Sequence, residues 1–346
     1  MVLRESLRVT DAMADHMESV QLRVNRETLE AFTSGSGVGI QSEIVARELP
    51  PFQSFMDEQC SLLTEVDARL SPEDRRTAVQ YHKMRVQPMF MSTRMVRRSV
   101  DQPFGYPGDY QMVEILFTPQ RERSSTFAQI LSQYLFDLGP SRAHRARVPW
   151  ALGHIRSREA TADRPLEVLS YACGPERVMR EYFAEGGTGV NLTLCDFDPR
   201  ALAHASAQIQ KATAKRDVRP TVRTIKNSAF DLIRDPGSAG ALSSARPDGL
   251  YDVVMVLGLF DYLTDQQIDK FLTALTNVLA PGGLCLVTNI CENNPWRALM
   301  EYTGDWTVIH RSKDAFGQLV AGDGRLRQQA LITDATGTNV YFCGVK

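Results

Sequence analysis

The sequence lacks the features of a metal-bound, disulfide-bonded, nucleic-acid-binding or membrane-spanning protein. Its six cysteines form no C-x-x-C pair, so we expect reduced thiols and no metal. The 39 basic and 41 acidic residues leave a formal charge of -2, too small to recruit nucleic acid. No apolar run approaches the roughly 20 residues of a spanning helix, and the N-terminus lacks the apolar segment of a signal peptide. We therefore expect a cytoplasmic protein that binds neither nucleic acid nor a membrane.

The first part of the chain, from about residue 3 to 138, has a helical pattern punctuated by glycine and proline. The run SGSGVG at 34–39 is expected to end a first helix, and Pro50-Pro51 a second. Ser71 followed by Pro72 and two acids predicts a new helix that breaks near Pro88. A basic run (Arg142, His144, Arg145 and Arg147) has helical spacing, which favours a solvated face.

From residue 165 the pattern changes to strands that alternate with helices. The first five predicted strands call for a parallel sheet with right-handed crossovers. The last two flank the hairpin signal at 334–337, so they should pair antiparallel. The predicted strands cover 166–171, 191–195, 221–226, 251–257, 283–289, 328–332 and 339–345. The fold class is therefore α/β, with a Rossmann-like sheet behind an N-terminal helical bundle.

The turn after the first predicted strand indicates the kind of nucleotide. A diphosphate-binding turn needs three glycines, whereas residues 172–176 (ACGPE) contain one glycine and end in the carboxylate of Glu176. This composition disfavours a diphosphate but allows a nucleoside. Asp196, at the end of the second strand, suits ribose hydroxyls, because a carboxylate can accept from both. The alternative, that it caps the following helix, fits Asp198 better.

Together with LAPGGLCLVTN at 279–289, these features resemble the class I S-adenosylmethionine-dependent methyltransferases, whose seven-stranded sheet ends antiparallel. The resemblance covers about 165–346. It implies S-adenosylmethionine as cofactor, S-adenosylhomocysteine as product and no metal. Ser170, Ala172 and Glu176 replace the family's usual acid and two of its glycines, and Ala172 is tolerable if its φ is negative. The expected cofactor-binding residues are Ser170, Tyr171, Ala172, Gly174, Asp196, Phe197, Asn227, Ser228, Leu257 and Tyr106.

A narrower resemblance extends over both halves of the chain. PFGYPGDYQMVEILF at 103–117, GLFDYL at 258–263 and NPWRALMEYTGDWTVIHR at 294–311 carry it. They resemble a bacterial subgroup of small-molecule methyltransferases, which includes the synthases of 3-hydroxypalmitic acid methyl ester and the free-arginine N-methyltransferase of nitrosourea (streptozotocin-type) biosynthesis. The resemblance implies secondary metabolism, with a substrate-recognition domain at 1–140 and a catalytic domain at 141–346. A homodimer is a further expectation.

The loops expected around the acceptor are rich in carboxylates. An amine or guanidine arrives protonated and needs carboxylates to hold it and take its proton. N-methylation of an arginine-like guanidine or amine is therefore the first hypothesis. The expected catalytic residues are Asp109, Asp261, Glu292 and Glu301, and the expected substrate-binding residues are Tyr110, Glu114, Tyr262, Arg297, Tyr302 and Trp306.

Two alternatives stay open. The first is methyl esterification of a (hydroxy) fatty acid, with Arg297 or His310 as the anchor of the carboxylate. The second is a non-catalytic scaffold that binds the cofactor. Each loop carboxylate also has a plain structural interpretation as a cap or an arginine partner; Arg297, for example, could pair with Glu301 four residues along a helix.

Overall fold

The computed structural model describes residues 1–346 except 36–38, 121, 123–124, 215–218 and 244–248. The chain forms two compact units. A helical unit contains Met1–Arg142 and Asn294–Thr307, and a sheet unit contains Ala143–Asn293 and Val308–Lys346. The helical unit therefore takes in a short segment from the second half of the sequence.

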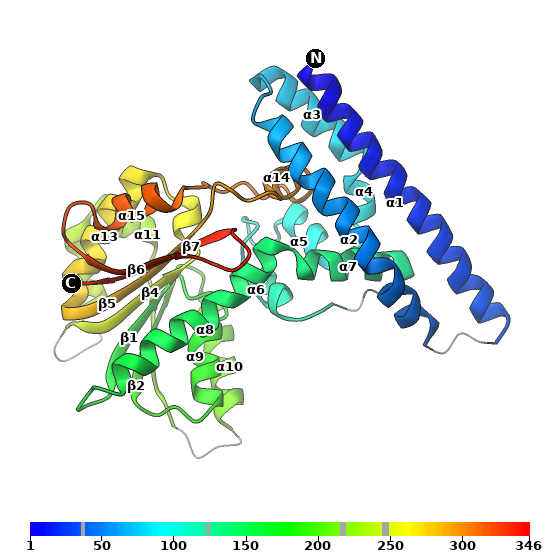
Figure 1. The fold of residues 1–346 in the computed structure, drawn as a ribbon. Coiled ribbons are helices and arrows are strands. Elements are labelled where there is room, and N and C mark those ends of the chain that lie inside the picture. The colour runs from blue at the N-terminus through cyan, green and yellow to red at the C-terminus, as the bar shows by residue number, and fades with distance from the viewer. Residues whose placement is uncertain (36–38, 121, 123–124, 215–218, 244–248) are drawn as a thin grey trace. The chain divides into compact units, whose positions relative to one another are not determined.

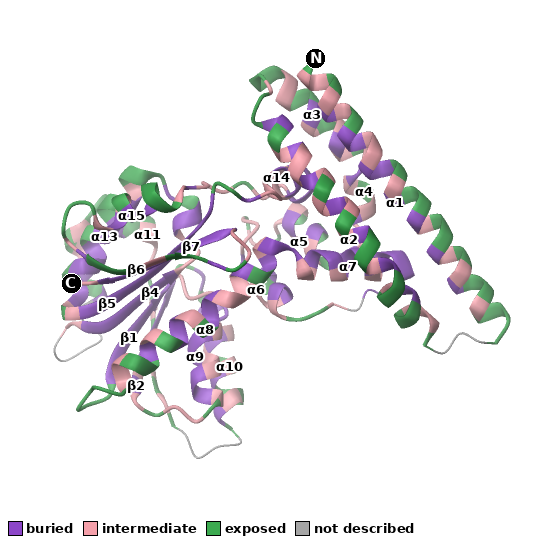
Figure 2. Ribbon diagram, in the orientation of Figure 1, coloured by how far each residue is buried: buried purple, intermediate pink, exposed green. Residues whose placement is uncertain are grey.

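The helical unit is built on two long helices. Helix α1 buries a stripe of apolar residues at helical spacing, including Val9, Met13 and Met17, and α2 packs against it. Figure 2 shows this as buried and exposed bands that alternate along both helices. The helices are α1 (Val2–Thr33), α2 (Ile40–Asp67), α3 (Pro72–Arg85), α4 (Gln87–Phe90), α5 (Arg94–Asp101), α6 (Tyr110–Phe117), α7 (Thr126–Asp137) and α14 (Arg297–Gly304).

Two helix boundaries test the expectations drawn from proline. The expected end at Pro50-Pro51 is wrong, because α2 continues through both prolines to Asp67. Its buried stripe runs from Ile44 across the prolines to Phe52 and Met56, so tertiary packing outweighs the lost hydrogen bonds. The start of α3 is confirmed: the Ser71 hydroxyl accepts from the Asp74 amide at 3.1 Å. The predicted break near Pro88 is also confirmed, since α3 and α4 separate at Val86.

The sheet unit has seven strands in the order β3-β2-β1-β4-β5-β7-β6. Neighbouring strands from β3 to β5 are parallel, and β7 is antiparallel to both β5 and β6. This confirms the predicted strands and the Rossmann-like α/β fold. The strands are β1 (Leu166–Tyr171), β2 (Val190–Asp196), β3 (Thr221–Lys226), β4 (Tyr251–Leu257), β5 (Leu279–Ile290), β6 (Arg327–Thr333) and β7 (Asn339–Val345).

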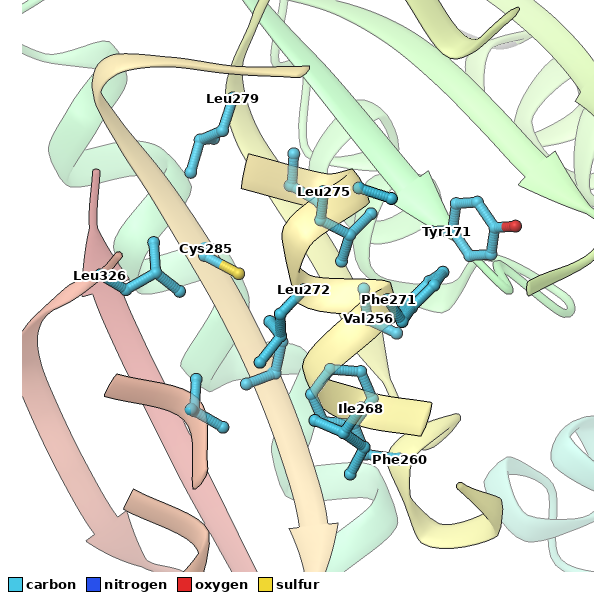
Figure 3. Close-up of a cluster of buried hydrophobic side chains, with 14 of the residues drawn as sticks. Tyr171, Val256, Phe260, Ile268, Phe271, Leu272, Leu275, Leu279, Cys285 and Leu326 are labelled. Atoms are coloured by element: carbon cyan, nitrogen blue, oxygen red, sulfur yellow. The ribbon is translucent and has the colours of Figure 1, made fainter. Parts of the chain in front are cut away.

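Helices cover both faces of this sheet (Figure 1). One face carries most of α8 (Gly139–Glu159) with α9 (Arg177–Ala184) and α10 (Pro199–Thr213); the other carries α11 (Ala229–Arg234), α13 (Asp265–Val278) and α15 (Lys313–Ala321). The short helices η1 (Pro236–Ala239), α12 (Gly240–Ser243) and η2 (Phe260–Tyr262) complete the unit. Figure 3 shows the core under α13, where Phe271 and Leu272 face Val256 of β4. The described helices include none long and apolar enough to cross a membrane.

Candidate active site at the carboxyl ends of the strands

The turn between β1 and α9 alternates through left-handed backbone. Ala172, Gly174 and Glu176 have φ values of 51°, 52° and 49°. The condition under which alanine is tolerable at 172, a negative φ, is therefore not met. An L-residue in this region costs roughly 1–2 kcal/mol. Such strain is typical of ligand-binding turns, where the surrounding structure maintains it.

Two buried carboxylates face this turn. Asp196, 5% exposed, accepts from the Gly174 amide through Oδ2 and from the Asp198 amide through Oδ1, both at 3.0 Å. Glu176, 3% exposed, accepts from the Met179 amide at 3.0 Å and from the Ser170 hydroxyl. Burial raises the pKa of both carboxyl groups. An anionic ligand would be repelled here, whereas a cation or a pair of hydroxyl groups would be attracted.

The acid that caps α10 is Asp198, as expected, and not Asp196. Its carboxylate accepts from the Arg200 amide at 2.9 Å and binds the Arg200 side chain. Asp196 therefore has no capping role to explain its burial. Its two backbone hydrogen bonds instead join the end of β2 to the turn after β1.

Other expected cofactor-binding residues gather at the same strand ends. The Tyr171 hydroxyl donates to Asn227 Oδ1 at 2.6 Å, and the Asn227 amide donates to the Asp196 carbonyl at 3.2 Å. Ser228 caps α11, and the Phe197 ring is 50% exposed. Leu257 ends β4. Tyr106, by contrast, belongs to the helical unit, in the loop between α5 and α6.

Asp261 links the ends of β4 and β5. Its Oδ1 accepts from the Ile290 amide at 2.6 Å, and its carbonyl accepts from the Ile309 amide at 2.7 Å. Burial raises the pKa of the Asp261 carboxyl, and the positive charge of Arg147 opposes that shift. The carboxyl is therefore held rigidly between two strand ends.

Arg147 is the residue that sequence reasoning missed. The expected solvated face is wrong for Arg147, which is only 5% exposed, and for His144, whose pKa is lowered by burial. The spacing along the helix could have indicated that Arg147 is buried. Ala143, Arg147, Ala151 and Ile155 follow one another at intervals of four residues and so lie on one face of the helix, and the two alanines and the isoleucine are fully buried. Arg147 Nη2 donates to Asn339 Oδ1 at 2.8 Å and approaches Asp261 Oδ2 at 3.4 Å.

A second arginine, Arg311, fixes the turn after β4. It donates to the carbonyls of Phe260 and Leu263 at 3.0 and 2.6 Å, and to Asn289 Oδ1 at 2.7 Å. It also forms an ion pair with Asp265. Two expected site residues lie on the segments that Arg311 contacts and are exposed. Glu292, after β5, donates its amide to the Arg311 carbonyl at 3.0 Å, and Tyr262 lies in η2, beside Leu263.

The expected catalytic carboxylate Asp109 lies in the helical unit and is fully buried. It caps α6 by accepting from the Gln111 and Met112 amides at 2.8 and 3.1 Å. It also pairs with Arg98, whose guanidinium lies 4.8 Å from the centroid of Phe104. Phe104 in turn stacks on Tyr110. These contacts account for the conformation of the 103–109 loop, and they occupy the Asp109 carboxylate.

Helix α14 carries further expected residues into the helical unit. Tyr302 donates to Asp67 Oδ1 at 2.6 Å, and Arg297 binds Asp67 Oδ2 at 3.2 Å. Glu301 forms an ion pair with Arg75, so Arg297 and Glu301 have partners other than each other. Trp306 and Glu114 lie in the same unit. The expected site residues thus form one cluster at the strand ends of the sheet unit and another inside the helical unit.

Comparison with known proteins agrees with this architecture. Residues 169–285 match the model of a methyltransferase domain family. A solved structure described as a possible exported protein from Bordetella parapertussis shares the fold, with a TM-score of 0.53, 16% identity and coverage of 73% of this chain and 86% of that one. Magnesium protoporphyrin IX methyltransferase from Synechocystis, with S-adenosylhomocysteine bound, has a TM-score of 0.49 and 12% identity. The match covers 72% of this chain and 98% of that one. A putative methyltransferase from Thermobifida fusca gives 0.48 at 15%, covering 68% and 94%. No curated protein matches the sequence.

Proposed function

We propose that this chain, which has a class I fold and matches a methyltransferase domain model over residues 169–285, transfers the methyl group of S-adenosylmethionine to a small-molecule acceptor. The observation that carries the proposal is the pair of buried carboxylates, Glu176 and Asp196, at the left-handed turn after β1. S-adenosylmethionine is cationic at its sulfonium and ammonium groups and carries two ribose hydroxyls, so it fits this pair, whereas a dinucleotide diphosphate does not.

The residues at the strand ends would hold the cofactor as follows. Asp196 retains lone pairs beyond its two backbone hydrogen bonds and would accept from the ribose hydroxyls. The exposed ring of Phe197 would pack on the adenine. When bound, the cofactor supplies a methyl group on a good leaving group, so the protein contributes mainly by positioning the acceptor and excluding water.

For the acceptor, N-methylation of an arginine-like guanidine or amine is our first proposal. It is supported by Asp261, a buried carboxyl with a raised pKa at the end of β4. A raised pKa makes the carboxylate a better proton acceptor at neutral pH. Glu292 follows β5, the strand next to β4, and Tyr262 exposes an aromatic ring on the same turn as Asp261. A cation bound there would meet negative charge and the face of a ring.

Methyl esterification of a carboxylic acid, such as a hydroxy fatty acid, is the second candidate. The buried guanidinium of Arg147 favours it, because that cation lies at the same strand ends. The carboxylate would arrive ionised and need no base. The two candidates therefore differ in whether the Asp261 carboxylate must accept a proton.

Transfer of isotopically labelled methyl groups tests both candidates. The purified protein is incubated with labelled S-adenosylmethionine and, separately, L-arginine, agmatine or 3-hydroxypalmitate, and the products are identified by mass spectrometry. We expect a methylated guanidine or amine. A methyl ester as the only product would establish the second candidate, and the absence of any labelled product would contradict both.

Asp196→Ala tests the cofactor site separately. Losing charge-assisted hydrogen bonds to the ribose should weaken S-adenosylmethionine binding by roughly 1.5–3 kcal/mol. Calorimetry measures the affinity, with Asp269→Ala, an exposed acid on α13, as the control. Equal affinities for a folded Asp196→Ala variant and the wild type would remove Asp196 from the site.

A further inference from the structure

Arg147 is an unusually buried arginine whose hydrogen bonds are incomplete. A guanidinium has five N–H donors. Nη2 makes the contacts with Asn339 and Asp261, while Nε is buried and has no partner among the described residues. Arg297 Nε is likewise buried without a hydrogen bond among the described residues, but the Arg297 side chain is 29% exposed against 6% for Arg147. A buried donor without a partner indicates a missing acceptor, such as a water, an ion or a ligand.

The carboxylate of Asp261, which lies beside Arg147, forms only a long ion pair with the guanidinium. Asp261 Oδ2 lies 3.4 Å from Nη2, longer than the 2.7–2.9 Å of a strong ion pair. The other oxygen of Asp261 accepts from the Ile290 amide. Arg311, the other buried arginine of this cluster, differs because all three of its nitrogens have acceptors. Of these two buried arginines, only Arg147 therefore retains an N–H donor that can bind another anion.

Gly258 brings this guanidinium to the strand end. It directly follows β4 and has a φ of 113°. A Cβ at this position would stand 2.6 Å from Arg147 Nη1 and would displace the guanidinium from its present position against the backbone. The carboxyl ends of the strands are where an open α/β sheet binds its ligands.

We propose that Arg147 binds a carboxylate group of the methyl acceptor. The proposal rests on the proposed function and narrows its substrate class. If the acceptor is an amino acid methylated on nitrogen, Arg147 binds its α-carboxylate, away from the reacting atom. If the acceptor is a carboxylic acid, Arg147 binds the carboxylate that receives the methyl group.

The test compares acceptors with and without a carboxylate. L-arginine and agmatine differ by that group alone, and 3-hydroxypalmitate provides a carboxylate without a guanidine. Kinetics with each are measured for the wild type, Arg147→Met, Arg147→Lys and the control Arg156→Met, which alters an exposed arginine on the same helix. Calorimetry follows the binding of S-adenosylmethionine to every variant.

For a carboxylate acceptor, Arg147→Met should lower kcat/KM by about 10- to 100-fold, mainly through KM, the range for a charge-assisted hydrogen bond. Arg147→Lys should recover part of the loss, because it keeps the charge. For agmatine the loss should be clearly smaller than for L-arginine, because only the effect of Arg147 on the Asp261 carboxyl remains. S-adenosylmethionine affinity and the Arg156→Met variant should be unchanged. If Arg147→Met does not fold, the KM values of Arg147→Lys and the wild type for acceptors with and without a carboxylate are compared instead.

Equal losses for L-arginine and agmatine, or an unchanged KM for every carboxylate, would overturn the proposal. If the wild type methylates none of the probes, the acceptor proposed above has failed. Calorimetric binding of L-arginine and 3-hydroxypalmitate in the presence of S-adenosylhomocysteine then decides the role of Arg147. Binding that Arg147→Met weakens supports the role, and the absence of wild-type binding overturns it.

Discussion

Ala172, in the turn after β1, has a left-handed backbone conformation. The residue has φ 51°, where a side chain is strained, yet the turn keeps alanine there instead of glycine. Glu176 is strained in the same way and uses its side chain to accept from the Ser170 hydroxyl and the Met179 amide. Ser170 is thus hydrogen-bonded to the carboxylate of a residue six positions later.

Ala172→Gly should stabilise the protein by about 1 kcal/mol, because glycine adopts this conformation without strain. Thermal or urea unfolding measures the change. The matched control is Ala214→Gly, at an exposed position where φ is -58° and glycine should destabilise. A loss of stability in both variants would show that Ala172 is not strained.

The stability of the helical unit should depend on pH because of His82. It is fully buried between Thr10 and Thr303, and burial lowers the pKa of His82 to about 3. The unfolded chain binds a proton near pH 6.5 and the folded protein does not. The free energy of unfolding should therefore fall by about 1.4 kcal/mol per pH unit as the pH drops from about 6 towards 3.

Urea unfolding at several pH values, for the wild type and His82→Gln, isolates this effect. The variant should lose less stability than the wild type between pH 6 and pH 4. Parallel curves for the two proteins would show that His82 is protonated in the folded state.

Among the elements, the strands could be predicted and the partners of the polar residues could not. The buried strands β1, β4 and β7 contain short apolar runs bounded by turn residues, so their identity is local information. The continuation of α2 through Pro50, by contrast, depends on packing against α1. Arg297 binds Asp67, 230 positions away in the sequence, and no local pattern contains such a pair. This is why the sequence places the expected cofactor-binding residues together at the strand ends, while it predicts a solvated face for Arg147.

The cap of α3 provides a prediction at this scale. Ser71→Ala removes the acceptor of the Asp74 amide and should lower the free energy of unfolding by about 1 kcal/mol. Ser61→Ala, inside α2, is the control and should have little effect because alanine favours a helix. Equal unfolding midpoints for the Ser71 variant and the wild type would contradict the role of the cap.

The whole molecule is divided in a way that sequence order does not suggest. The segment Asn294–Thr307 follows β5 but belongs to the helical unit. Trp296 Nε1 donates to Asp57 Oδ1 at 2.9 Å, and Ala298, Leu299 and Tyr302 are buried in the helical core. The chain leaves and re-enters the sheet unit at one place, since Cys291 and Arg311 form a β-bridge.

Two truncations test this division. A protein of residues 143–346 would expose the apolar side of α14, so we expect it to aggregate or bind a hydrophobic dye. A second protein, also of residues 143–346 but with a short glycine-serine linker in place of 294–307, should be monomeric and unfold cooperatively. The β-bridge between Cys291 and Arg311 holds the joined ends together, and no apolar helix is exposed. Size-exclusion chromatography and thermal unfolding compare them. Identical behaviour of the two would show that α14 does not depend on the helical core.

The split origin of the helical unit also constrains how such proteins can recombine. A single crossover near residue 142 would combine the long helices of one parent with the α14 of another. Asp67, which binds Arg75, Arg297 and Tyr302, would then come from one parent, and Arg297 and Tyr302 from the other. An exchange of the helical unit between related proteins therefore needs two coordinated replacements, with both segments taken from the same donor.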